Sequence, residues 1–174
     1  ALGQSVRKAV KKAGIRPDQV TAMTVDTTCC SVVALDSAGN AVRPALIWMD
    51  VRSAKQAEQL VATGDAALCI NSNGNGPVSA EWMIPKALWI QQNEPELFDR
   101  AFTVCEYQDY LNLHLTGRRV ASINNVASRW HYNRSRGGIP QSLLKSLDLE
   151  ALAEKWPQEV LALGEVIGGL TTEA

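Results

Sequence analysis

Segments with the spacing of amphipathic helices alternate along this chain with short apolar runs of strand length, and this alternation limits its possible folds. Strands are predicted over 20–25, 31–35 and 45–48. The sequence 36–40 is rich in turn formers and joins the second strand to the third as a hairpin. Helices and strands mixed in this way predict an α/β domain with a mixed sheet, a hairpin and flanking helices.

Helix boundaries are predicted from caps, glycines and prolines. The opening helix ends at Gly14, and its apolar face holds Leu2, Val6, Val10 and Ala13. Asp50 is expected to cap a helix that Gly64 ends, with an apolar face of Val51, Ala54, Ala57 and Val61. Pro85 is placed in the first turn of a helix that runs to about Asn93, since a proline inside a helix costs about 3 kcal/mol.

The rest of the chain continues the same alternation. We expect a loop at 71–77, a short helix after Pro95, a strand at 102–105, a helix at 107–115 ended by Gly117, late helices carrying Leu143, Leu144, Leu147 and Leu152, and an entry into further sheet at 160–170.

Composition excludes several classes of protein. The 174 residues fit one domain or a piece of one, and a net charge of -1 gives no long-range attraction to nucleic acid or to an anionic membrane. No apolar run approaches the roughly 18 residues that a membrane span needs. The amphipathic start is unlike a signal peptide, and the four cysteines show no metal-ligand spacing. Reduced thiols in a cytoplasmic protein are expected.

A polar bend separates the first two predicted strands. The segment 25–32 places small polar and thiol side chains between two valines, among them Thr28 and Cys29. Such a bend leaves amides and hydroxyls free for a hydroxylated ligand. A tight structural turn explains the same residues equally well.

A second candidate lies where the third predicted strand meets the next helix. Trp48, Asp50 and Arg52 occupy alternate positions there, and ligands of open α/β sheets gather at strand ends. A carboxylate and a guanidinium can hydrogen-bond sugar hydroxyls, and an indole face suits the carbons of a sugar. In the alternative, Asp50 is only a helix cap, Arg52 forms a surface pair and Trp48 belongs to the core.

The helix start around Pro85 is the third candidate. Glu81 and Lys86 flank a helix end whose bare amides and positive dipole suit a polar substrate, although both side chains could be exposed and idle. The polar clusters 106–109 and 122–125 are interpreted as structural. His114 and His131 have no triad-like or metal-like neighbours, and no phosphate-binding glycine loop is present.

Three stretches in order give the chain a wider resemblance. They are RPALIWMDVR, EWMIPKALWIQQNEPE and DYLNLHLTG. Together they resemble the N-terminal domain of the FGGY carbohydrate kinases over almost the whole chain. The EWMIPK wording and the TTCCSVV loop are closer to pentulose kinases of the ribulokinase kind than to glycerol kinases.

The resemblance implies a partial ribonuclease H-like (actin-like ATPase) domain. It also implies a kinase that uses ATP with Mg²⁺ to phosphorylate a terminal hydroxyl of a sugar or polyol, ribulose ahead of xylulose. The substrate-binding positions carried over are Thr28, Cys29, Trp48, Asp50, Arg52, Glu81 and Lys86. The chain departs from the family pattern at Met83, where a small residue or proline is usual.

By the same resemblance, residues 1–174 are the central part of the N-terminal domain. The phosphate-binding hairpin is expected before Ala1, and the general-base aspartate and the ATP-binding domain after Ala174, so both ends are interpreted as cuts. No catalytic residue is assigned within the chain, and 1–174 alone is expected to be inactive, without tight binding of ATP or Mg²⁺.

Other interpretations stay open at this point. One is a non-catalytic sugar-binding or regulatory module of actin-like fold. A ribonuclease H-like nuclease is weaker, because Asp26, Asp36 and Asp50 make a poor two-metal set. The expected partner is a small sugar or polyol, with no nucleic acid and no membrane. Self-association is expected through exposed sheet edges and apolar faces.

Overall fold

The computed structural model describes residues 2–70 and 76–174. Eight α-helices are found there: α1 (Leu2–Ala13), α2 (Ala54–Ala62), α3 (Met83–Asn93), α4 (Pro95–Arg100), α5 (Tyr107–Thr116), α6 (Ile123–Arg129), α7 (Gln141–Ser146) and α8 (Ala151–Lys155). The strands of these residues are β1 (Val32–Leu35), β2 (Thr103–Glu106), β3 (Val120–Ser122) and β4 (Glu159–Leu161). Short 3₁₀ turns are η1 (Pro17–Gln19), η2 (Ala66–Ile70) and η4 (Arg134–Arg136).

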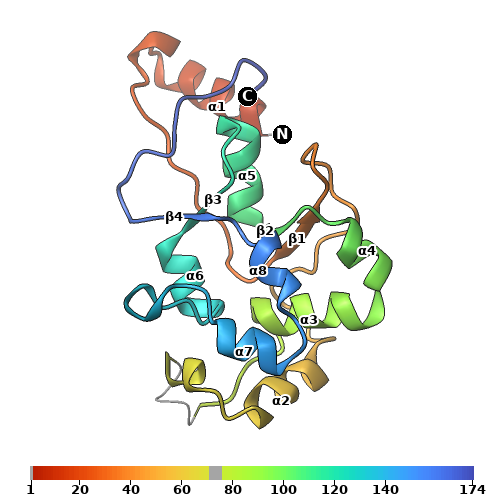
Figure 1. The fold of residues 1–174 in the computed structure, drawn as a ribbon. Coiled ribbons are helices and arrows are strands. Elements are labelled where there is room, and N and C mark those ends of the chain that lie inside the picture. The colour runs from red at the N-terminus through yellow and green to blue at the C-terminus, as the bar shows by residue number, and fades with distance from the viewer. Residues whose placement is uncertain (1, 71–75) are drawn as a thin grey trace.

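The strands form two small sheets, so the α/β class is confirmed while the single mixed sheet is not. β1 pairs antiparallel with β2, and β3 pairs parallel with β4. Figure 1 shows α1 and α5 at the end of the molecule that carries both termini, with α2, α3 and α7 at the opposite end. No helix among the described residues is long and apolar enough to cross a membrane.

The predicted strand at 20–25 is wrong. Its residues are mostly exposed, and the backbone hydrogen bonds found in the described part of the chain give it no neighbouring strand. An apolar run needs a neighbouring strand to pair with, and the hydrogen bond found here in the described residues comes instead from the Gln108 side chain, which donates to the carbonyl of Val25 at 3.1 Å.

The hairpin after β1 is confirmed in a looser form. Val32 and Leu46 exchange both backbone hydrogen bonds, and Val42 donates to Ala34. The segment predicted as a strand at 45–48 is therefore held beside β1 by an isolated bridge rather than by a full ladder. This leaves residues 47–50 irregular, next to the sheet.

The start of α2 also differs from the prediction. The helix begins at Ala54 after Ser53, and its buried residues are Gln56, Ala57 and Leu60. Val51 and Val61 are exposed, so the predicted apolar face was rotated. The helix cap assigned to Asp50 is wrong because its carboxylate accepts from the backbone N–H and guanidinium of Arg52 instead.

Most other helices are confirmed. Pro85 lies in the first turn of α3, and Gly117 ends α5 with a left-handed φ of 73°. α1 forms as predicted, although none of its residues is buried. Of the further sheet predicted at 160–170, only β4 forms, and most of the loop predicted at 71–77 lies outside the described residues.

The core is built around α3, which is apolar on nearly all sides. Met83, Ile84, Ala87, Leu88 and Ile90 are all inaccessible to solvent, as expected for a helix surrounded by other elements. Trp130 and Trp156 complete the core, with ring centroids 4.2 Å apart and both side chains fully buried. This packing fixes α3 as the rigid element against which the candidate segments rest.

We predict that Trp156→Ala lowers the free energy of unfolding by about 3–5 kcal/mol, because it removes a fully buried indole from this pair. Trp48→Ala is the matched control, since that indole is 44% exposed, and its loss should stay below about 1 kcal/mol. Urea denaturation measures both, and equal losses would contradict the packing described.

Candidate functional site

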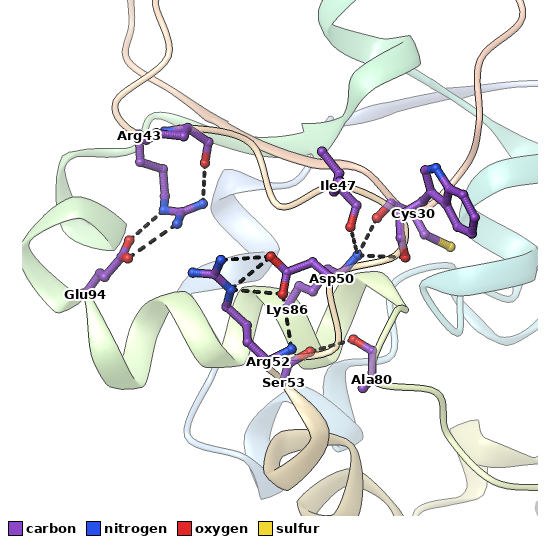
Figure 2. A network of polar contacts seen from close by, with 11 residues as sticks. Cys30, Arg43, Ile47, Asp50, Arg52, Ser53, Ala80, Lys86 and Glu94 are labelled. Atoms are coloured by element: carbon purple, nitrogen blue, oxygen red, sulfur yellow. Dashed lines mark hydrogen bonds and ion pairs between the residues drawn. The ribbon is translucent and has the colours of Figure 1, made fainter.

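The ammonium of Lys86 connects all three candidate segments of the sequence. Lys86 lies in the first turn of α3 and is fully buried. Its Nζ donates to the carbonyls of Cys30 and Ile47, each at 2.7 Å, and approaches that of Trp48 at 3.5 Å (Figure 2). The polar bend, the segment after the hairpin and the start of α3 therefore meet at one nitrogen atom.

Burial of this lysine has an electrostatic cost that its surroundings offset only in part. Desolvation lowers the pKa of Lys86, while the carboxylates of Asp50, Glu81 and Glu106 favour the charged form. The three donor hydrogens of an ammonium match the three carbonyl oxygens found around it. Lys86 thus holds the site together, and a direct contact with a sugar stays a prediction.

Cys30 gives the polar bend its direction. Its φ is 68°, in the left-handed region that costs a residue with a Cβ about 1 kcal/mol or more. The conformation turns the chain from the exposed Thr28 into β1. Cys29 is half-buried beside it, with its Sγ 3.7 Å from the Sγ of Cys30.

Asp50 and Arg52 form an ion pair beside the ammonium. The Arg52 guanidinium lies 2.9 Å from the Asp50 carboxylate, and it also covers the ring of Trp89 at 4.9 Å. Partial burial opposes ionisation of Asp50, but the hydrogen bonds from Arg52 outweigh it and lower the pKa of Asp50. The pair is therefore charged and fixed in place at neutral pH.

The side chains predicted to bind a ligand differ in exposure. Thr28 is exposed, Trp48 is 44% exposed, and Cys29 and Glu81 are half-buried. Trp48 does not belong to the core, which was one of the alternatives for it. Ser53 supports the same region, because its hydroxyl donates to the carbonyl of Ala80 at 2.6 Å. That these side chains contact one ligand stays a prediction.

Glu106 is the residue that sequence reasoning placed only in a structural cluster. It ends β2, is fully buried, and accepts a hydrogen bond at Oε2 from the Cys30 amide at 3.3 Å. Its own amide donates to Asp109 at 3.0 Å. Two carboxylates three residues apart at a helix start were the available signal, but they pointed to capping alone.

Burial dominates the titration of this cluster. Desolvation raises the pKa of Glu106 to about 7, although the Cys30 amide and the cations Arg129 and Lys86 lower it in part. Desolvation also raises the pKa of Asp109 and brings that of Cys30 to about 12. Glu106 is therefore a carboxyl group that changes charge close to neutral pH.

The described residues contain no group of three His, Cys, Asp or Glu side chains able to hold a metal ion. A separate cavity of about 290 Å³ lies between η2 and residues 136–142, and buried His131 lines it. It contains none of the predicted site residues.

Comparisons with known proteins agree on one family. Residues 1–174 match the N-terminal domain of the FGGY family of carbohydrate kinases. A xylulose kinase of Streptomyces coelicolor is 31% identical over 170 residues, which are 97% of this chain and 34% of the relative. A ribulokinase of Bacillus licheniformis is 23% identical over 188 residues, with 99% of this chain and 34% of the relative covered.

The fold leads to the same group of proteins. A solved structure from Brucella ovis, described as a xyloylose kinase, superposes with a TM-score of 0.77 and 26% identity. The match covers 95% of this chain and 34% of that protein. The chain thus spans about a third of the length of these relatives.

We predict that Lys86→Met lowers the free energy of unfolding by about 2 kcal/mol, because the carbonyls of Cys30 and Ile47 lose their donor while the volume is kept. Lys145→Met, on the exposed side of α7, is the control and should change it by less than about 0.5 kcal/mol. Indistinguishable melting curves for the two variants would show that Lys86 does not hold the segments together.

A second prediction concerns pH. Because the folded pKa of Glu106 is about 7 against an ordinary 4.5, the native state binds the proton more tightly, and stability should fall as pH rises between these values. Glu106→Gln removes this penalty, so the variant should gain roughly 3 kcal/mol relative to wild type between pH 4.5 and 7.5. Chemical denaturation across this range tests it, and parallel stability curves would contradict the assignment.

Proposed function

Since the chain belongs to the FGGY family of carbohydrate kinases, we propose that it is the sugar-facing part of the N-terminal domain of an ATP-dependent ketopentose kinase. The reaction is transfer of the γ-phosphoryl group of ATP to a primary hydroxyl of the sugar. Ribulose is the first candidate substrate and xylulose the second, and related polyols follow. A cytoplasmic location and a partial ribonuclease H-like, actin-like fold belong to the same proposal.

The observation that carries this proposal is the convergence at Lys86. One buried ammonium holds the bend at Cys30 and the backbone of Ile47 against the start of α3. Polar Thr28 and the indole of Trp48 are left accessible at this junction. Hydroxyls and amides beside an aromatic face are what a polyhydroxylated molecule requires of a binding wall.

The ion pair gives the wall its fixed charges. The Asp50 carboxylate still has accepting capacity for a sugar hydroxyl while Arg52 keeps it ionised. Because the pair and the bend are already held in place, a bound sugar need not order them, and this preorganisation reduces the entropy cost of binding.

The remaining chemistry belongs outside these residues in our proposal. ATP would be the phosphoryl donor, Mg²⁺ held outside these residues would neutralise charge on its phosphates, and an aspartate beyond Ala174 would accept the proton of the attacking hydroxyl. Residues 1–174 bind and orient the sugar. Orientation alone can account for a large part of the rate, because phosphoryl transfer depends on the in-line approach of the hydroxyl.

The direct experiment is an ATP-coupled assay of the full-length kinase with ribulose, xylulose and glycerol. We expect turnover with the ketopentoses, ribulose first, and at least tenfold lower kcat/KM with glycerol. Sugar binding without turnover would instead favour a non-catalytic module of the same fold. Turnover with glycerol alone would reject the ketopentose assignment.

Trp48→Ala tests the wall itself. We predict that it raises the KM for the ketopentose about tenfold, a loss of about 1.4 kcal/mol in binding, and leaves the KM for ATP unchanged. Phe102→Ala is the control, because this residue is 49% exposed just before β2 and its ring packs under the Arg119 guanidinium instead of belonging to the wall. Equal effects of the two substitutions would remove Trp48 from the site.

A further inference from the structure

The bend that carries Thr28 and Cys29 depends on a residue whose backbone conformation is unfavourable. Cys30 has a φ of 68° and is not a glycine, so the bend does not form from local preference alone. Something in the fold must hold the two peptide groups of Cys30. The structure shows a partner for each of them.

Both partners are buried charged side chains from distant parts of the sequence. The amide of Cys30 donates to Glu106 Oε2 at 3.3 Å, and its carbonyl accepts from Lys86 Nζ at 2.7 Å. Glu106 and Lys86 are both fully inaccessible to solvent. Cys30 is therefore held between the end of β2 and the start of α3.

Glu106 is itself fixed from two sides. It is the register partner of Val32 in the antiparallel pair of β1 and β2. The amide of Tyr107, the next residue, donates to the carbonyl of Ser31 at 3.0 Å. Asp109 accepts from the Glu106 amide, so the carboxylate that reaches Cys30 starts from a rigid position.

We propose that Glu106 is a positioning residue for the sugar: together with Lys86 it clamps the left-handed Cys30 and so aims the Thr28–Cys29 bend at the substrate. This proposal rests on the proposed function, because a role in orienting a sugar requires that the site binds one. Glu106 acts through the bend and does not touch the substrate.

The charged and titratable groups around Glu106 give the clamp a pH dependence. Lys86 and Arg129 face it as cations, and Cys30 and Asp109 are its other titratable neighbours. An ionised carboxylate accepts the hydrogen bond from the Cys30 amide more strongly than a neutral carboxyl group does. Since the pKa of Glu106 is about 7, the KM for the sugar should fall as pH rises from 6 to 8.

The test compares Glu106→Leu with Glu106→Gln in the full-length kinase. The leucine leaves the Cys30 amide without an acceptor, so we expect the KM for the ketopentose to rise at least tenfold while kcat and the KM for ATP change less than threefold. The glutamine keeps an acceptor oxygen and should restore the KM to within about threefold of wild type, with no dependence on pH between 6 and 8. The proposal is overturned if the sugar KM is unchanged in both variants. It is also overturned if kcat falls and the KM for ATP rises by as large a factor as the sugar KM.

A readout without catalysis separates this proposal from the proposed function. Cys30 is 5% exposed, and we expect Glu106→Leu to speed its alkylation by iodoacetamide at least tenfold, as measured by mass spectrometry. Cys105, 3% exposed in β2, is the internal control for general unfolding and should stay protected. If wild type lacks ketopentose kinase activity while Cys30 alone gains reactivity, the clamp stands and the proposed function fails. An unchanged alkylation rate at Cys30, or equal labelling of Cys30 and Cys105, would show that Glu106 does not clamp the bend.

Cys30→Gly supplies a second, independent test. Glycine occupies the left-handed region without a Cβ clash, so the bend should need its clamp less. In this background Glu106→Leu should raise the sugar KM by less than about threefold, compared with at least tenfold beside Cys30. Equal effects in the two backgrounds would contradict the link between Glu106 and the conformation of Cys30.

Discussion

The buried ammonium of Lys86 is the interaction on which the site depends. Irregular segments have no ladder to satisfy their carbonyls, and a buried carbonyl without a donor is costly. Lys86 satisfies those of Cys30 and Ile47 from the side of α3, a helix fixed by the core around it. One side chain thereby supplies hydrogen-bond donors to two loops and sets their distance from each other and from the helix.

At Glu106, the charge state that favours folding differs from the charge state that favours the proposed function. Burial makes its ionised form unfavourable in the folded state, yet the ionised form holds the Cys30 amide more firmly. A glutamine at this place would relieve the folding penalty and weaken the electrostatic link to Lys86. The ionised carboxylate thus strengthens the hold on Cys30 at a cost in folding stability, and this combination fits a role in positioning the bend rather than in stabilising the fold.

The sequence predicted elements whose signals are local and missed those that depend on distant partners. Pro85 and Gly117 marked helix ends correctly because their backbone geometry acts within a few residues. The strand at 20–25 failed because a strand requires a partner that its own sequence does not specify. From the sequence, Lys86 either lies beside a polar substrate or is exposed and idle. The structure buries it, and its role as a brace depends on carbonyls 39 and 56 residues away along the chain.

In our proposal, the bend at Thr28–Cys29 and the indole of Trp48, drawn together by Lys86, form one wall that binds a ketopentose. A crystal structure of the full-length kinase with ribulose tests it most directly. We expect sugar hydroxyls within hydrogen-bonding distance of the bend, sugar carbons against the Trp48 ring, and unchanged hydrogen bonds from Lys86 to the carbonyls of Cys30 and Ile47. A sugar bound elsewhere, for example in the cavity beside His131, with this wall left to solvent, would contradict it.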